Sequence, residues 1–312
     1  MSSPLISAAR RVTMIDAVQL AQNLVNGIGL GLIYGLIGIG FCVIYNASGI
    51  VNFGQGVFVM LGGMICATFL ARFGLPIWLA AIVTVPVVAL IGVAMEVAVV
   101  RPMWKRGASI FAIILATLAS QMLIEQVTLL GLGDQPRTFN SFTPGGPLMI
   151  GGVALPYQFF WVLGCGALMV AGLWAFFTRT RSGRALRACS QNAEAAALLG
   201  IPVRRMMMLS FALSAGLGAV AGILITPSQI TAYNVATPFG INGFIAAIIG
   251  GFGSAAGAVA GGLLLGVFQA LAIAFLGASF KNVAALSVLL VVLLVFPQGI
   301  LAPLKTLRAS RR

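Results

Sequence analysis

Long apolar stretches follow one another along almost the whole chain and are separated only by short polar segments. The stretches are continuous rather than alternating, which favours helices over strands, and about 20 apolar residues in a helix cross a bilayer. The pattern predicts an all-α polytopic membrane protein with about eight to nine transmembrane helices. The apolar windows cover residues 17–45, 50–71, 76–100, 109–131, 156–178, 206–227, 239–256, 258–278 and 283–302.

Two features of the windows leave the helix pattern open in detail. The windows 239–256 and 258–278 meet in a run of glycine, serine and alanine at 253–257, so they form either two crossings or a pair of short half-helices. Glycines also recur every four residues, as at Gly27, Gly31 and Gly35. Small residues on one helical face let backbones approach closely in a membrane, so close helix packing is the expected role of these glycines.

The composition supports a membrane protein. Of the 312 residues, 60% are hydrophobic and 7% are charged, and the mean hydropathy is +1.09. Soluble domains carry roughly 25% charged residues, so this chain lacks the material for a water-facing surface all round. In lipid the backbone groups must be satisfied internally, which leaves helices or closed barrels.

The net charge of +13 lies in short clusters between the windows. Cytoplasmic loops of membrane proteins are rich in lysine and arginine, and no nucleic-acid motif is present. Basic clusters after the third window, in the segment 179–205 and at the carboxyl end therefore predict these three regions on the cytoplasmic side. The expected organisation is an external tail over 1–16, one membrane domain over 17–302 and a basic cytoplasmic tail over 303–312; Arg10 and Arg11 do not fit the external placement.

Catalytic and metal chemistry is not expected. The chain has no histidine, and its four cysteines form no Cys-x-x-Cys pair, so we interpret the cysteines as small packing residues. It contains no Gly-x-x-x-x-Gly-Lys-Ser/Thr loop for phosphates and no set of nucleophile, base and orienting group. The protein is predicted not to be an enzyme and to need no cofactor.

The loop 179–205 contains the most specific local signal. Asn192 is a suitable N-cap, Glu194 lies in the first turn where the helix dipole favours an acid, and Gly200 and Pro202 end the helix. Between them stand strong helix formers, Ala195, Ala196, Ala197, Leu198 and Leu199. A helix this short is marginal alone in water, so it docks either on its own membrane domain or in the groove of a cytosolic partner.

The loop and four further segments resemble a known family. Glu194-Ala-Ala, followed after three residues by Gly200, resembles the coupling loop of bacterial ABC importer permeases. Together with the other blocks it resembles the branched-chain amino-acid permeases of the LivH type, from about residue 20 onward. The other blocks are Tyr34-Gly-Leu-Ile-Gly-Ile-Gly, Ile50-Val-Asn-Phe-Gly-Gln-Gly, the glycine-rich segment 250–266 and Phe296-Pro-Gln-Gly-Ile.

The resemblance implies a permease subunit of a bacterial inner-membrane importer. Its implied partners are a second permease, two cytosolic ATPases that hydrolyse the ATP, and a periplasmic binding protein, with membrane lipid around it and no nucleic acid. The short helix would then be a cytoplasmic coupling helix that transmits ATP-driven movement. The coupling residues implied are Asn192, Glu194, Ala195, Ala196, Leu198, Leu199 and Gly200.

The sequence leaves the cargo open. The family often has histidine and an acid where this chain has Gln55 and Val57, and aspartate where Asn192 stands. The resemblance therefore extends to branched-chain or related amino acids, and to amides or urea. Polar side chains in apolar windows are costly unless partnered; they line the translocation path or join helices by hydrogen bonds, and both roles stay open for Asn46, Asn52, Gln55, Asn242 and Gln269.

A proton- or ion-coupled secondary transporter is the alternative function. Such a carrier needs a titratable group inside the membrane, and Glu96 and Glu125 are the candidates in the apolar windows. The short helix of the loop 179–205 discriminates between the two classes, since an ATPase-coupled permease needs it and a secondary carrier does not.

Overall fold

The computed structural model of the protein describes residues 17–296 and Gly299. Within these residues, eight helices are long and apolar enough to cross a membrane, which confirms the predicted fold class. The tails 1–16 and 303–312 lie outside the described residues, and the domain boundaries stay predictions. The helices are α2 Ala17–Ser48, α3 Gln55–Phe73, α4 Ile77–Met95, the π-helix η1 Glu96–Val100, α5 Arg101–Lys105, α6 Ile110–Leu132, α7 Tyr157–Arg179, α8 Arg181–Gln191, α9 Ala193–Leu198, α10 Val203–Ile225, α11 Ala236–Gly250, α12 Ala255–Leu276, the 3-10 helix η2 Ala278–Phe280 and α13 Lys281–Val295.

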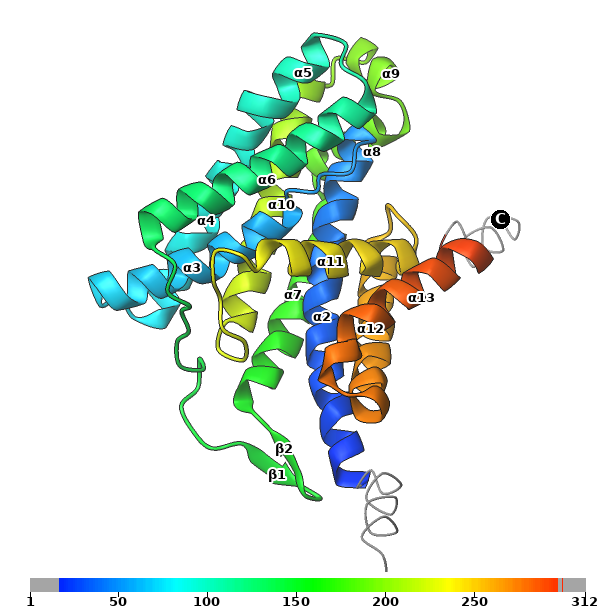
Figure 1. Cartoon of the computed structure of the whole chain (residues 1–312). Helices are drawn as coiled ribbons and strands as arrows, with labels where there is room; N and C mark the ends of the chain where they lie inside the picture. The colour runs from blue at the N-terminus through cyan, green and yellow to red at the C-terminus, as the bar shows by residue number, and fades with distance from the viewer. Residues whose placement is uncertain (1–16, 297–298, 300–312) are drawn as a thin grey trace, which may run out of the picture.

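The bundle is built around α2, which packs against α7, α10, α11 and α12. One end of the bundle carries α5, α8 and α9, and the other carries the first turns of α2 beside a small hairpin (Figure 1). The hairpin pairs β1 Leu148–Ile150 with β2 Val153–Leu155 in antiparallel register. These strands lie in the polar segment between α6 and α7, and Gln22 ties α2 to them by hydrogen bonds with both backbone groups of Ala154.

The most extensive helix packing is between α2 and α12, at a surface that we call the glycine seam: Gly27, Gly31 and Gly35 on α2 with Gly262 and Gly266 on α12. A Cβ atom added to Gly31 would lie 2.7 Å from the carbonyl oxygen of Gly262, and one added to Gly27 would lie 2.6 Å from that of Gly266. Such contacts leave no room for a side chain. The close-packing interpretation of the α2 glycines is confirmed.

The two meeting windows fold differently from one another. The first becomes α11, whose 15 residues span about 22 Å at 1.5 Å per residue, less than the roughly 30 Å of a bilayer core. α11 lies across the axis of α2 rather than along it (Figure 1), whereas α12 is a full-length candidate span. Gly251 and Gly253 turn the chain between them with φ of +88° and +87°.

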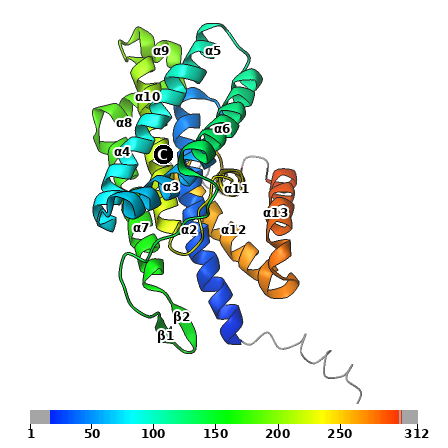
Figure 2. The ribbon, with the colours of Figure 1, turned by 60° about the vertical axis from the view of Figure 1, so that its left-hand side comes forward.

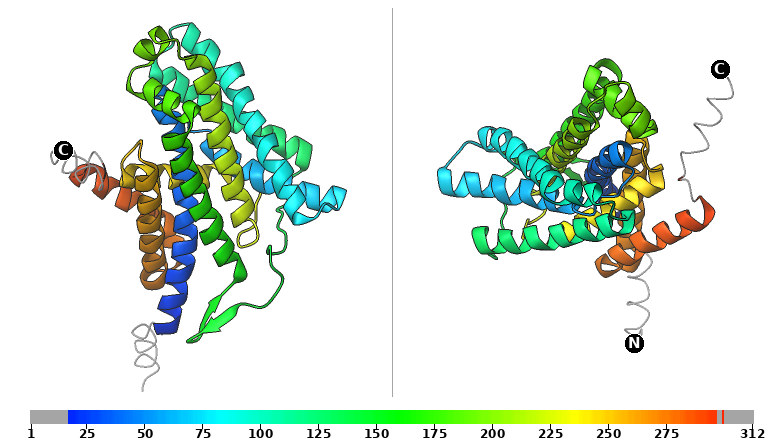
Figure 3. Two further views of the ribbon diagram at one scale, coloured as in Figure 1. Left: turned by 180° about the vertical axis from the view of Figure 1, so that it is seen from behind. Right: turned by 90° about the horizontal axis from the view of Figure 1, so that it is seen from above.

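Two interruptions shape the rest of the bundle. The chain leaves helical structure between Ser48 and Gln55, and Asn52 is fully buried in this break. α4 instead continues through the π-helix η1 into α5, so that Ile77–Lys105 forms one candidate span. α13 stands at the edge of the bundle, where it packs on α11 and α12, and it is clearly separated from α7 and α10 in the turned views (Figures 2 and 3).

Candidate functional site

Helix α9 is the short helix that the sequence predicts in the loop 179–205. The Asn192 side-chain oxygen accepts a hydrogen bond of 2.9 Å from the Ala195 backbone N–H, and Glu194 lies in the first turn. The chain leaves the helix through Gly200 with φ of +79°. The predicted cap and stop are both confirmed, because each depends on a local side-chain or backbone preference.

The two sides of α9 have opposite surroundings. Ala196 is 2% exposed and faces the protein, whereas Leu198 is 90% exposed and Leu199 is 82% exposed. We call Leu198 and Leu199 the leucine tip. The tip lies at the end of the bundle that also carries α5 and α8 (Figure 1). Adjacent leucines held outward on a capped helix form a small apolar contact surface, and Glu194 is exposed on the same helix.

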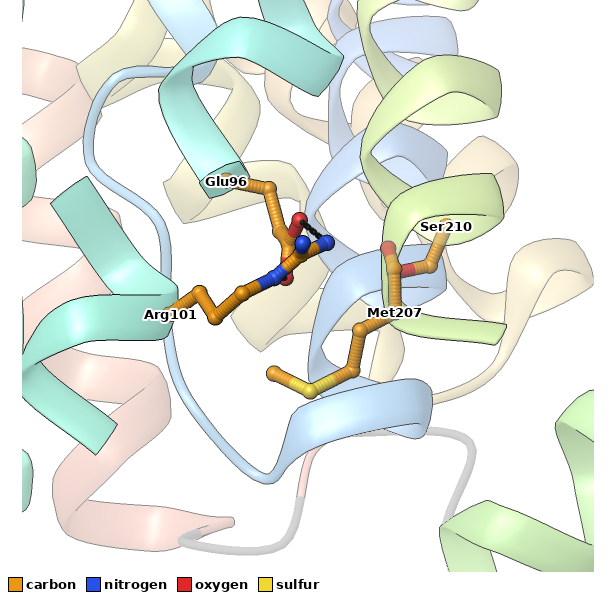
Figure 4. Close-up of polar contacts among 4 residues, drawn as sticks. All are labelled: Glu96, Arg101, Met207 and Ser210. Carbon is orange, nitrogen blue, oxygen red and sulfur yellow. Dashed lines mark hydrogen bonds and ion pairs between the residues drawn. The ribbon is translucent and has the colours of Figure 1, made fainter. Parts of the chain in front are cut away.

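A cavity of about 440 Å³ lies beside α9, between the end of α2, η1, α5, α8 and the start of α10. Glu96 and Arg101 line it and form a two-pronged ion pair, with Arg101 Nη2 2.5 Å from Glu96 Oε2 and Nε 3.1 Å from Oε1. Figure 4 shows the pair next to Met207 and Ser210 of α10. Glu96 is 1% exposed, so Arg101 supplies the partner that a buried carboxylate requires.

The π-helix explains how this pair forms. Glu96 and Arg101 are five residues apart, and η1 occupies the residues between Met95 and Arg101. A π turn bonds residues five apart, which brings these two side chains to the same face. The proton-relay candidate Glu96 is therefore bonded to an arginine. The other candidate, Glu125, is half-buried and accepts a 3.1 Å hydrogen bond from Gln121, which also donates to Thr237.

The cysteines hold neither a disulfide nor a metal in the described part of the chain. Cys66, Cys165 and Cys189 are free thiols and Cys42 donates a hydrogen bond to the Ser254 carbonyl oxygen, and no group of three metal-ligating side chains occurs among the described residues. Cys189 of α8 lines the cavity beside α9. Burial raises the pKa of the Cys189 thiol above its ordinary value, so this side chain stays neutral.

Three of the predicted path residues form hydrogen bonds in different parts of the protein and do not contact one another. Gln55 of α3 donates to the Ser214 carbonyl oxygen at 3.1 Å and accepts from the Ser214 hydroxyl at 2.5 Å, which joins α3 to α10. Asn46 donates to the Gly253 carbonyl oxygen at 2.9 Å and fixes the turn before α12. Asn52 accepts from the Gly54 N–H at 3.0 Å within the break after α2.

The other two predicted path residues meet one another. Gln269 Nε2 donates to Asn242 Oδ1 at 2.7 Å, and Asn242 Nδ2 donates to the Pro238 carbonyl oxygen at 2.8 Å. This pair joins α11 to α12. Gln269 Oε1 is buried without a partner. A role of these five residues in a translocation path stays a prediction.

Two further polar side chains are not among the residues predicted from the sequence. Gln158 of α7 is 2% exposed and donates to the Leu224 carbonyl oxygen at 2.7 Å, joining α7 to α10. Lys281 lines a cavity at the hairpin end of the bundle. Gln158 is a polar residue inside the window 156–178, so the rule that selected Gln269 would have found it. Lys281 was passed over because it lies just outside its window.

Comparison with known proteins identifies the family. The family described as the permease component of branched-chain amino acid transport systems matches residues 23–296, nearly the whole chain. The chain belongs to this family. The predicted family resemblance is confirmed, and so is the prediction that the chain itself is not an enzyme.

Individual relatives align with this chain over most of both sequences. The chain is 33% identical over 302 residues to the high-affinity branched-chain amino acid transport system permease protein BraD of Pseudomonas aeruginosa, covering 92% of this chain and 97% of the relative. It is 32% identical to LivH of Escherichia coli K12, a protein of the same description, covering 90% and 94%. The ribose import permease protein RbsC of Haemophilus influenzae is 26% identical, covering 88% and 84%.

A solved structure shares the fold. PsaBC from Streptococcus pneumoniae, in complex with Fab, aligns with a TM-score of 0.50 at 15% identity and covers 96% of this chain and 99% of that one. By its family and its candidate spans, the protein is a multi-pass membrane permease subunit of the branched-chain amino acid ABC transport class. Membership of a transport system implies an ATPase and a binding protein as partners.

Proposed function

We propose that the chain forms the translocation path of an importer for branched-chain or closely related amino acids, and that the leucine tip receives the movement of an ATPase. The observation that carries the coupling role is the exposure of Leu198 and Leu199 on a capped helix. Exposed apolar side chains at the end of a bundle favour contact with a partner protein.

The orientation follows from charge. Basic residues of three polar segments gather at the α9 end, and cytoplasmic loops are enriched in such residues. We infer that this end faces the cytoplasm of a bacterial inner membrane, so that α2 begins outside and α13 ends toward the cytoplasm. The basic residues are Arg101, Lys105, Arg106, Arg181, Arg184, Arg187, Arg204 and Arg205.

The proposed assembly contains a second permease, two ATPases and a periplasmic binding protein. Ala196 anchors α9 on the bundle, while Asn192 and Gly200 fix where it starts and stops. Glu194, Ala195 and the leucine tip would contact the ATPase. Movement of α9 would be transmitted to α10, which follows it directly in the chain, and the bundle would alternate between outward and inward access.

The path would use the amide pair of Asn242 and Gln269, because its two members line different cavities. Gln269 lines a cavity of about 420 Å³ and Asn242 lines one of about 290 Å³. Asn46, Asn52 and Gln55 would contribute by holding the breaks after α2 and before α12. A break in a membrane helix is a common feature of transport pathways.

The experiment is a pull-down of the tagged chain from mild detergent, using cells that express all the proposed subunits. Wild type should retain the ATPases and the second permease. Leu198→Arg with Leu199→Arg should lose the ATPases and keep the second permease, since the tip alone is changed. The matched variant Leu198→Met with Leu199→Met keeps the surface apolar and should retain both.

A different result would contradict the proposal. The coupling role fails if the arginine variant retains the ATPases as well as wild type does. The importer itself fails if the wild-type chain purifies alone and moves solute in liposomes on a proton gradient without ATP, in which case Glu96 and Glu125 become the residues to study.

A further inference from the structure

Helix α11 begins at the middle depth of the membrane-spanning bundle. Gln121 is the central residue of the 23-residue helix α6, and its Nε2 donates to Thr237 Oγ1 in the first turn of α11 at 2.8 Å. Thr237 and Pro238 are both exposed. Backbone that leaves helical structure at this depth is tolerated where protein or water covers it, but not against lipid. The start of α11 therefore requires a cover that the described part of the chain does not supply.

A carboxylate lies one turn along α6 from Gln121. Glu125 is half-buried, and its Oε1 accepts a 3.1 Å hydrogen bond from Gln121. The one ion pair among the described residues joins Arg101 to Glu96, so no described cation neutralises Glu125. Acidic side chains in membrane helices are costly, and they face protein or a water-filled space rather than lipid. The side of α6 that carries Glu125 is therefore expected to meet protein.

A groove between α11 and α13 lies beside these residues. It has a volume of about 290 Å³, and its polar lining is formed by Thr237, Asn242 and Asn282. Asn242 already bonds within the chain, whereas Asn282, the second residue of α13, is exposed. Exposed amide and hydroxyl groups at membrane depth require hydrogen-bonding partners, which lipid tails lack.

The groove and Glu125 belong to one side of the molecule. Helices α6, α11 and α13 lie in front of α2 in Figure 1, whereas α7 and α10 lie in front in the view from behind (Figure 3). We call Glu125, Thr237 and Asn282 the polar face. The apolar side chains of Ile241 and Leu286 line the same groove and are also exposed, so the face combines polar groups with an apolar contact area.

We infer that the polar face is the contact surface for the second permease of the proposed assembly, and that a side chain of that subunit donates a hydrogen bond to Glu125. This inference rests on the proposed function and names the surface through which its second permease is held. Hydrogen bonds between helices join membrane helices that lack a hydrophobic drive for association, and the polar face offers both acceptors and donors for them.

The charge of the face favours a different subunit over a second copy of this chain. A second copy would bring another Glu125, and like charges facing one another disfavour a pairing. Its Lys281, the basic residue of α13, lines the cavity at the hairpin end instead of this groove. Glu125 thus selects a partner that carries a donor or a cation at the facing position.

The first test is site-directed photo-crosslinking in cells that express all the proposed subunits. The photoreactive residue p-benzoylphenylalanine replaces Ile241 or Leu286 in the groove, or Leu168 on α7, which is exposed on the opposite side of the bundle. Both groove positions should yield a crosslinked product with the second permease, and Leu168 should yield none. The product is identified through a tag on the second permease.

The second test changes the carboxylate. Glu125→Leu should lower the amount of second permease recovered with the tagged chain by about ten- to a hundredfold, the range for a lost hydrogen bond to a charged group. Glu125→Gln keeps an acceptor oxygen and should cause a smaller loss. Leu168→Ala on α7 should change nothing. If Glu125 faced lipid instead, Glu125→Leu would remove a costly group and recovery would not fall.

The inference is overturned if Glu125→Leu retains the second permease like wild type. It is also overturned if the groove positions crosslink to a second copy of this chain or to no protein, or if Leu168 alone reaches the second permease. Should Glu125→Leu not fold, the crosslinks from Ile241 and Leu286 decide the matter. In each of these cases the second permease still purifies with wild type, whereas failure of the importer proposal would show as a wild-type chain that purifies alone.

Discussion

The glycine seam and the leucine tip use apolar residues in opposite ways. The seam packs two helices against one another, whereas the tip leaves two leucine side chains exposed. In the seam, α2 and α12 approach until backbone atoms touch, and a single methyl group at Gly31 would lie 2.7 Å from the Gly262 carbonyl oxygen. At the tip, two leucines stand 90% and 82% exposed. Lipid removes most of the hydrophobic drive for helix association, so the seam depends on close fit. The tip lies at one end of the bundle, and its two leucine side chains can be buried only by a partner protein.

The largest expected effect comes from breaking the seam. Gly31→Val should prevent stable folding, because its Cβ would meet backbone atoms of Gly262 and Leu263 that cannot rotate away. Side-chain overpacking costs about 1–3 kcal/mol and occasionally more, and a clash with backbone atoms exceeds this range because neither helix can give way without separating. Fluorescence-detected size-exclusion after heating would measure the loss.

The control for this change is Gly164→Val in α7, where an added Cβ meets no atom within 4 Å. This variant should melt close to wild type. Equal losses in both variants would show that valine in a membrane helix, rather than the seam, causes the effect.

The next largest effect concerns the buried ion pair beside α9, at the same end of the bundle as the leucine tip. It tests how much this end contributes to the stability of the protein. Arg101→Met leaves Glu96 buried without a partner, which typically costs about 3–5 kcal/mol. The melting temperature of the purified protein should fall. The double variant Glu96→Met with Arg101→Met removes both charges and should recover most of the stability; a double variant as unstable as the single one would contradict this account.

The tip should behave in the opposite way to the seam. Leu198→Arg with Leu199→Arg should lower ATP-driven leucine uptake by about tenfold or more, which corresponds to about 1.4 kcal/mol. The melting temperature should stay near wild type, since exposed substitutions usually change stability by about 0.5 kcal/mol or less. Uptake in cells and melting of the purified protein are measured together. A fall in melting equal to that of Gly31→Val would mean that the tip is part of the core.

The sequence predicts the local features of both regions and misses the ones that depend on tertiary contacts. Hydropathy and glycine spacing are read within one helix, and the Asn192 cap acts over three residues, so these predictions were confirmed. For the two windows that meet at 253–257, the sequence left open two crossings or a pair of half-helices. It did not predict one short, crosswise helix, α11, beside a full-length α12, because the direction of α11 is set by its packing on other helices.

The polar contacts show the same limit. Gln269 and Asn242 are identifiable as polar residues in apolar windows, but nothing in a window predicts that they bond to one another across 27 residues. The pair of Glu96 and Arg101 requires a π-helix, which apolar periodicity does not reveal. The cavity at the hairpin end combines side chains from five helices, so no single stretch of sequence indicates it.

The smallest expected effect comes from the cap that holds the tip in place. Asn192→Ala removes the 2.9 Å hydrogen bond to the Ala195 N–H and should destabilise α9 by about 1 kcal/mol. Hydrogen exchange at Ala195 should speed up about fivefold, with leucine uptake reduced by no more than that factor. Asn192→Asp retains a capping oxygen and should leave both quantities near wild type. If uptake fell as far as in the arginine variant of the tip, Asn192 would contact the ATPase itself, and the boundary between the supporting and the docking residues of α9 would move to include it.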